Sequence, residues 1–273
     1  MTRGFTDSLQ LYRRLLGAQL RSQMQYRTAF VFDVISTMLF TITEFGALVL
    51  TFQRFPSIGG WNVLEVMFLY GLVEFSFGLM DMIFAGFDPP RFAEYVRKGT
   101  LDQFLLRPSS LYVQIFGSDF TLRRIGRLFL SAGIFAYAVI HLEVHWTLEK
   151  LLYLPFVILG MVLFFGGLFI VGATITFWTI DSTEAMNILT YGGSSLIQYP
   201  MNIYNEWLRQ FFTFVVPALF LNYQPALWFL GKPDPFHLPE FTHFLAPTAG
   251  GSVFLVALMF WNFGLRHYQG TGN

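Results

Sequence analysis

Residues Leu151–Ile180 read LLYLPFVILGMVLFFGGLFIVGATITFWTI, thirty positions without an acidic, basic or histidine side chain. About 20 consecutive apolar residues suffice for an α-helix to cross the hydrocarbon core of a bilayer. In that core every backbone N–H and C=O must be satisfied within the protein, which favours a helix. The stretch therefore predicts a membrane-spanning helix, and with it an integral membrane protein.

Five further apolar runs of similar length predict five more spans. They are Ala29–Phe52, Asn62–Phe87, Ile125–Leu142, Gln210–Leu230 and Leu245–Leu265. Arg127 falls inside the third of these, where we expect it to snorkel toward the interface. No segment shows the alternation of about ten residues that is typical of an outer-membrane barrel. We expect an all-α, polytopic membrane protein of six transmembrane helices, forming a single domain over residues 1–273.

The position of the fifth span is ambiguous. In one version Gln210–Leu230 crosses the membrane although Pro217 and Pro225 interrupt it. In the other version Glu184–Tyr199 crosses, and the proline-broken run enters and leaves from the outer side as a re-entrant hairpin. Arg209 favours the first version, and both versions leave the last helix in the same orientation.

The composition supports the membrane class. The chain is 54% hydrophobic and 12% charged, with a mean hydropathy of +0.52. A soluble domain is roughly 25% charged, so this inventory cannot cover a water-facing surface. The absence of cysteine excludes disulfides and cysteine-ligated zinc.

Lysine and arginine are distributed unevenly between the loops, which sets the orientation of the chain. Fourteen of the 17 fall on the side of the N-terminus: Arg3, Arg13, Arg14, Arg21, Arg27, Arg91, Arg97, Lys98, Arg107, Arg123, Arg124, Arg127, Arg209 and Arg266. Only Arg54, Lys150 and Lys232 fall on the other side. We therefore expect a multi-pass protein of the inner (cytoplasmic) membrane with both termini in the cytoplasm.

Residues 5–26 differ in kind from the spans. Apolar residues recur at helical spacing, whereas basic residues lie off that stripe. The apolar residues are Leu9, Tyr12, Leu16, Leu20 and Met24, and the basic ones are Arg13, Arg14 and Arg21. This pattern predicts an interfacial helix whose basic face lies among the headgroups of membrane lipid. The alternative is a poorly ordered polar leader.

The polar segment between the second and third spans, Asp88–Pro108, reads DPPRFAEYVRKGTLDQFLLRP. Asp88 suits an N-cap before Pro89, and Gly99 suits a helix stop. Thr100 with Gln103 matches the capping box of a second helix. Two short helices that mix apolar and charged side chains predict a docking surface for a cytoplasmic partner. The alternative is a membrane-surface turn with snorkelling arginines.

Acidic residues inside the spans need a partner or a cavity, because a charge at the bilayer centre costs a few kcal/mol. Glu44 and Glu74 both fall near mid-span, in the first and second spans. We expect adjacent helices to bring them together as a polar surface on a substrate pathway. The alternative is that each is a protonated or hydrogen-bonded packing residue.

Signatures of catalysis are missing from the sequence. It has neither a Gly-x-x-x-x-Gly-Lys-Ser/Thr P-loop nor a His-Glu-x-x-His pair. Ser194 and Ser195 suggest an intramembrane serine nucleophile, but no histidine is placed mid-span to activate it. Small residues there favour close helix packing instead. We expect no catalytic residue, cofactor or metal in this chain, and no nucleic-acid partner.

Three segments carry a resemblance to a known family. They are Tyr95–Pro108 (YVRKGTLDQFLLRP), Tyr199–Tyr204 (YPMNIY) with Val216-Pro217-Ala218, and the tail Gly264–Gly272 (GLRHYQGTG). With the layout of spans, they make the chain similar to the membrane permeases of bacterial type-two ATP-binding-cassette (ABC) exporters. The likeness is closest to an uncharacterised branch in which two different permeases are usually paired with one ATPase.

The resemblance implies a six-helix permease with an N-terminal elbow helix and re-entrant outer helices between the last two spans. It also implies a cytoplasmic coupling helix, here Pro89–Arg107, that fits a groove on the ATPase. Within that element our hypothesis assigns ATPase docking to Phe92, Tyr95, Arg97, Leu101, Asp102, Phe104 and Arg107.

We therefore expect a non-catalytic permease subunit of an ATP-driven ABC exporter. It would form the substrate pathway with a second permease, paralogous or identical, and couple to a separate ATPase subunit that binds ATP and Mg²⁺. An aromatic, weakly charged interior admits lipids, peptides and amphipathic drugs alike, so the substrate is not specified. The rival is a non-transporting membrane scaffold or sensor that recruits a cytoplasmic partner, since it would share every span and the docking loop.

Overall fold

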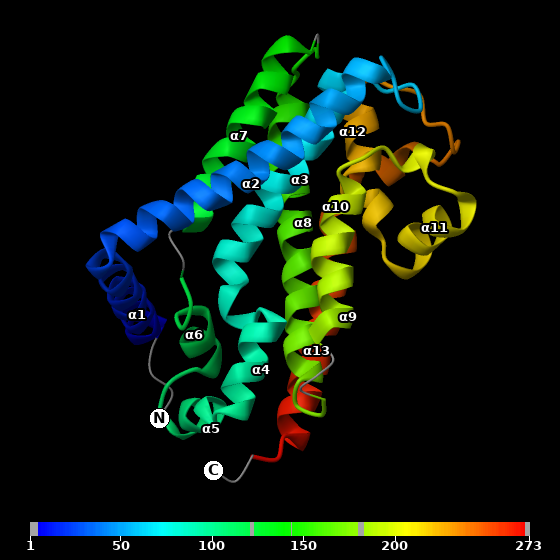
Figure 1. The fold of residues 1–273 in the computed structure, drawn as a ribbon. Coiled ribbons are helices and arrows are strands. Elements are labelled where there is room, and N and C mark those ends of the chain that lie inside the picture. Colours follow the sequence, from blue (N-terminus) through cyan, green and yellow to red (C-terminus); the bar gives the residue numbers. More distant parts are fainter. Residues whose placement is uncertain (1–4, 121–122, 143, 180–182, 271–273) are drawn as a thin grey trace.

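The computed structural model describes residues 5–120, 123–142, 144–179 and 183–270 of the 273-residue chain. Every regular element in these ranges is a helix, which confirms the all-α prediction (Figure 1). The longer helices are α1 (Phe5–Gln25), α2 (Arg27–Arg54), α3 (Val63–Phe84), α7 (Arg123–His141), α8 (Leu148–Ile175) and α13 (Ala246–His267). The shorter α-helices are α4 (Pro89–Arg97), α5 (Thr100–Leu106), α6 (Leu111–Phe116), α9 (Thr183–Asn187), α10 (Gly193–Ile197), α11 (Glu206–Gln210) and α12 (Tyr223–Leu230).

Four helical runs are long and apolar enough to cross a membrane. They are Arg27–Arg54, Val63–Arg97, Leu148–Ile175 and Ala246–His267. A fifth is added if Glu206–Phe214 and Ala218–Leu230, which meet at 79°, are counted as one broken span. The predicted third span coincides with α7, which is not among these runs and carries three arginines. Length and apolarity thus give four or five spans among the described residues, against the six predicted.

The bundle is organised around α3. Within its most apolar stretch 72% of residues are buried, against 11% for α2. The helix starts with a capping box, in which the Asn62 side chain accepts from the Glu65 N–H and the Glu65 carboxylate accepts from the Asn62 N–H. α7, α8 and α10 pack on α3, whereas α2 crosses it obliquely and contacts chiefly α7 (Figure 1).

The two ends of the bundle are defined by different elements (Figure 1). α4, α5 and α6, together with α1 and the last turns of α13, form what we call the α4 end. The turn at Ile58–Trp61, closed by reciprocal backbone hydrogen bonds of 3.0 Å, marks the opposite, Gly59 end. α1 is tied to the α4 end because the Gln19 side chain donates to the Ser118 carbonyl at 2.7 Å and Gln23 donates to the Phe120 carbonyl. The side chain of Leu9, part of its predicted apolar stripe, lies outside the described residues.

Two short helices form in the segment Asp88–Pro108, with different caps from those predicted. α4 starts at Pro89, but the Asp88 side chain makes no capping hydrogen bond. Gly99 ends α4 at φ +66, a conformation that favours glycine. Gly99 also occupies the N-cap position of α5, so Thr100 is already helical and the predicted capping box with Gln103 does not form.

The region between α8 and α13 has the geometry of the re-entrant version, because its proline-broken run starts and ends at the same end of the bundle. The Asn202 side chain donates to the Gly59 carbonyl at 2.7 Å, and Lys232 Nζ donates to the Gly60 carbonyl at 3.0 Å. Both ends of the proline-broken run therefore lie at the Gly59 end, and the run does not connect the two ends of the bundle. The helical run Thr183–Ile197 connects them instead, since α9 packs on α4 while the Ile197 carbonyl accepts from the side chain of Asn222 in the proline-broken run.

α8 and α13 approach each other closely where two glycines, Gly160 and Gly250, face one another. A Cβ added at Gly250 would overlap the Gly160 carbonyl, and one added at Gly160 would overlap the Ala246 carbonyl. Small residues at such crossings let helix backbones meet in a membrane, where packing rather than water drives association. The α8–α13 contact therefore depends on the absence of these side chains.

We expect Gly250→Ala to destabilise the protein by about 1–3 kcal/mol, because the added methyl group has to separate α13 from α8. The thermal midpoint of the purified protein in detergent measures this. Gly251→Ala is the matched control, since a Cβ there meets nothing within 4 Å. Equal midpoints for the two variants would contradict this account of the crossing.

Candidate functional site

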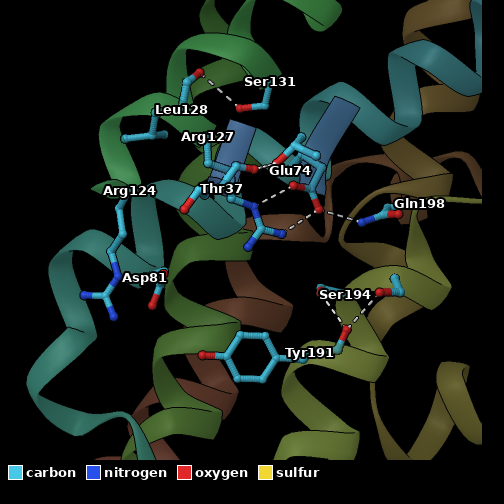
Figure 2. A network of polar contacts seen from close by, with 12 residues as sticks. Thr37, Glu74, Asp81, Arg124, Arg127, Leu128, Ser131, Tyr191, Ser194 and Gln198 are labelled. Atoms are coloured by element: carbon cyan, nitrogen blue, oxygen red, sulfur yellow. Dashed lines mark hydrogen bonds and ion pairs between the residues drawn. The ribbon is translucent and has the colours of Figure 1, made fainter. Parts of the chain in front are cut away.

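A carboxylate with no exposed surface lies in the middle of α3. Glu74 is 0% exposed, and Arg127 of α7 binds it through two hydrogen bonds, from Nε to Oε2 at 2.7 Å and from Nη2 to Oε1 at 2.9 Å. The Gln198 amide, just past α10, donates to Oε1 at 2.7 Å. Figure 2 shows Arg127 and Gln198 approaching Glu74 from opposite sides. Three separate helical segments are thus joined at one carboxyl group.

A second ion pair repeats this arrangement two turns along α3. Asp81 lies seven residues after Glu74, and its Oδ2 is 2.8 Å from Arg124 Nε (Figure 2). Arg124 precedes Arg127 by three residues on α7, as expected where the two helices are antiparallel. Both pairs lie along the α3–α7 contact, and in each pair the arginine neutralises the carboxylate.

These pairs change the roles predicted for the ionisable residues in the spans. Arg127 does not snorkel to the interface but is held inside the bundle by Glu74. Glu74 pairs with Arg127 and so has the character of a packing residue. Glu44 of α2 makes no hydrogen bond or ion pair with either of them among the described residues, so its place on a pathway stays a prediction. Complementary charges at matching turns of neighbouring spans were the signal that the sequence analysis missed.

Ser194 does not resemble a nucleophile. Its hydroxyl donates to the Tyr191 carbonyl at 2.8 Å, a bond within its own helical turn (Figure 2). No histidine hydrogen-bonds to it in the part of the chain that the structure describes, and those residues hold no cluster of metal ligands.

The segment α4–α5 is held against the bundle by apolar side chains. Phe92 is 0% exposed, and its ring lies 5.4 Å from Trp261 and 5.9 Å from Phe177 between ring centroids. Leu101 is likewise fully buried, and Phe104 is buried beside Tyr95. Aromatic packing therefore holds α4 against α13 and the residues that follow α8, and holds α5 against α4.

This burial divides the seven residues predicted to dock a partner into two groups. Phe92, Leu101 and Phe104 face the chain's own interior, so in this conformation they position the segment and are not available to a second protein. Arg97 and Arg107 are exposed. No docking role was predicted for Leu105 or Leu106, which are 47% and 86% exposed.

Tyr95 and Asp102 are half-buried and link the segment to its neighbours. The Tyr95 hydroxyl donates to Ser118 Oγ at 3.0 Å. Asp102 lies beside the tail that follows α13, where burial, together with this carboxylate, raises the pKa of the Tyr268 phenol to about 12. The tail and the segment, which the sequence places far apart, thus lie side by side at the α4 end.

The Glu74–Arg127 pair yields a prediction about stability. Arg127→Met leaves the buried carboxylate without its cation and should cost about 3–5 kcal/mol. The double variant Glu74→Gln/Arg127→Met removes both charges and should recover most of that loss, because Gln198 can still hydrogen-bond to the amide. Thermal midpoints of the single and double variants in detergent measure the effect. A double variant that is less stable than Arg127→Met would contradict the pairing.

Comparison with known proteins identifies the family. The sequence matches the family described as ABC-2 family transporter protein over residues 38–272. No match is found among curated proteins or among solved structures. The matched region includes the α4–α5 segment, the re-entrant run and the tail, and confirms the resemblance drawn from those residues. The chain therefore belongs to the ABC-2 transporter family and has the features of its membrane permease subunits.

Proposed function

We propose that this chain is the permease subunit of an ATP-driven exporter, and that a separate ABC ATPase docks on α4–α5 at the α4 end. Membership of the ABC-2 family, whose members are non-catalytic membrane subunits, supports the assignment. The chain has no P-loop with which to bind nucleotide phosphates. ATP and Mg²⁺ would therefore be bound by the partner, and α4–α5 would pass on the ATPase's movement.

The observation that carries the proposal is the character of the exposed surface of α4–α5. Leu105 and Leu106 are exposed, as are Arg97 and Arg107 in the same segment, and we name these four residues the coupling surface. The buried aromatic residues Phe92 and Phe104 attach this segment to the bundle. Exposed leucines flanked by arginines on a fixed scaffold suit a protein interface, because binding then costs little ordering of the chain. In this refined version Phe92, Leu101 and Phe104 support the surface instead of touching the ATPase.

We propose six passes through the inner membrane. They are α2, α3, α7, α8, the run Thr183–Ile197 and α13. The arginines of α7 lower its mean hydropathy below that of the other spans. Arg124 and Arg127 are paired with acidic residues of α3, however, and so need not face lipid. The re-entrant run supports the assignment, since both of its ends lie at the Gly59 end. The distribution of lysine and arginine supports a cytoplasmic location for the α4 end and both termini, and α1 would lie as an elbow helix among lipid headgroups.

A second permease, identical or paralogous, would complete the pathway. α2 carries exposed apolar residues along most of its length, so lipid or another permease must cover it. Glu44 lies on this helix and is exposed, so in the proposed assembly its carboxylate would be available to line the pathway. Glu44, and not the buried Glu74, is therefore the pathway residue that we propose.

The coupling surface is tested by Leu106→Asp, which places a charge where an apolar contact with the ATPase is expected. The variant should reduce co-purification of an ATPase encoded beside this chain by about ten-fold or more. The matched control is Leu148→Asp, which changes a leucine that is 72% exposed at the start of α8, near the Gly59 end. Undiminished co-purification with Leu106→Asp would contradict docking at this surface, whereas equal loss in both variants would indicate a general effect on the membrane protein.

A further inference from the structure

Arg209 is a half-buried cation without a carboxylate partner. It belongs to α11, whose first turn is fixed by the Asn205 side chain, which accepts from the Leu208 N–H at 2.9 Å. The Arg209 guanidinium makes no hydrogen bond or ion pair among the described residues. It lies over the ring of Phe236, 4.6 Å from the ring centroid. An aromatic face thus orients the guanidinium while its five N–H groups lack an acceptor in the described part of the chain.

The acidic side chains of the same region are engaged by other donors. Asp234 uses both carboxylate oxygens on three donors, the Gln224 side chain and two backbone N–H groups, at 2.9–3.0 Å. Glu206 accepts from the Gln210 side chain at 3.2 Å, within α11. Neither carboxylate forms an ion pair with Arg209, so the positive charge remains available to a ligand.

Arg209 lines a cavity of about 350 Å³. Gln210 and Thr213 are the other polar residues of its lining. The rest of the lining is apolar and comes from the re-entrant run and from the loop after α12: Phe214, Leu219, Pro235, Phe236 and Leu238. Small-molecule sites typically have volumes of roughly 300–1,000 Å³, apolar walls and a few polar groups. The cavity therefore has the size and the mixed character of such a site, with its cation in the wall.

The cavity lies toward the Gly59 end. The two segments that line it are tied to that end, because Asn202 donates to the Gly59 carbonyl and Lys232 donates to the Gly60 carbonyl. Figure 1 shows α11 beside the bundle, away from α4 and α5. Arg209 was predicted to lie on the side of the N-terminus, whereas the re-entrant geometry puts it in the opposite half. In the orientation that we propose, this is the outer half of the membrane.

We propose that this cavity binds an amphiphile with an anionic head, which Arg209 holds while the apolar body lies against Phe214 and Leu238. The planar guanidinium can donate two parallel hydrogen bonds to a phosphate, sulfate or carboxylate group. An inorganic anion would leave the apolar walls uncovered, and a cationic amphiphile would be repelled by the arginine. An anionic membrane lipid and a free single-chain amphiphile share the chemistry that fits. Neither requires an exporter, so the inference goes beyond the proposed function.

The experiment measures binding of radiolabelled dodecyl phosphate to the full chain in phosphatidylcholine nanodiscs, with empty nanodiscs as the background. We expect saturable binding that Arg209→Gln weakens by about ten-fold or more, because the charge-assisted hydrogen bonds are lost. The matched control is Arg54→Gln, which removes an exposed arginine at the Gly59 end and should leave the affinity unchanged. Dodecyltrimethylammonium has the same chain and the opposite charge, and should not compete. Equal affinity in wild type and Arg209→Gln, or competition by dodecyltrimethylammonium as strong as by unlabelled dodecyl phosphate, would overturn the proposal.

Two exposed aromatic residues test the apolar part of the site. Phe214 is 81% exposed and lines the cavity, whereas Trp207 is 72% exposed and does not. Phe214→Ala should weaken binding of dodecyl phosphate about five-fold, because an apolar contact is lost, and Trp207→Ala should preserve it. Neither change removes a buried side chain, so both variants should keep the thermal midpoint of the wild type. The same affinity in both variants would place the ligand outside this cavity and overturn the proposal.

Phosphatidylglycerol separates the two sources of the ligand. It is added to the nanodiscs at one lipid in ten, with empty nanodiscs of the same composition as the background. Loss of dodecyl phosphate binding to the wild type would identify an anionic membrane lipid as the ligand. Unchanged binding would identify a free single-chain amphiphile. Either result supports an anionic amphiphile at Arg209.

Co-purification of the ATPase with Arg209→Gln keeps this inference distinct from the proposed function. The coupling surface lies on α4–α5, at the other end of the bundle from the cavity, so docking should persist in this variant (Figure 1). A wild type that docks an ATPase but does not bind dodecyl phosphate would refute the anion site alone. Binding of dodecyl phosphate without any docking of an ATPase would refute the exporter assignment alone.

Discussion

Glu74 is buried in the middle of α3, and its two oxygens are held by Arg127 of α7 and by Gln198 at the end of α10. An unpaired charge is so costly inside a membrane that these contacts permit only one register of the three helices. Asp81 and Arg124 fix the same register a second time. The position of the Thr183–Ile197 run beside α3 depends on the same carboxylate, through Gln198.

Much of the fold follows from local features of the sequence. The apolar runs predicted the positions of α2, α3, α7, α8 and α13 because the need to satisfy the backbone leaves lipid-exposed chain few alternatives. The caps at Asp88 and Thr100 were predicted wrongly, since Gly99 in a left-handed conformation serves α4 and α5 together. Sequence spacing indicates where one helix ends and the next begins, but not which of two adjacent residues takes the capping position.

The site was harder to predict for a different reason. Tyr95–Pro108 correctly indicated a distinctive segment, yet a list of its apolar residues does not show which of them face the chain's own bundle. Phe92 is buried by Trp261 and Phe177, which come from distant parts of the sequence. Only tertiary packing separates such supporting residues from exposed ones such as Leu106. Arg127 illustrates the same limit, because its partner is more than fifty residues away in the chain.

The continuity of α3 with the short helices after it has a mechanical consequence. Val63–Arg97 forms 35 residues of nearly unbroken helix, about 50 Å of contour at 1.5 Å per residue. One end of this rod carries α4, and at the other the turn Gly59–Gly60 holds both Asn202 and Lys232. In the proposed coupling, a movement of α4 would be carried along this helix to the run that is bound at the Gly59 end. The residues from Val63 to Arg97 would then be the mechanical link between the two ends of the bundle.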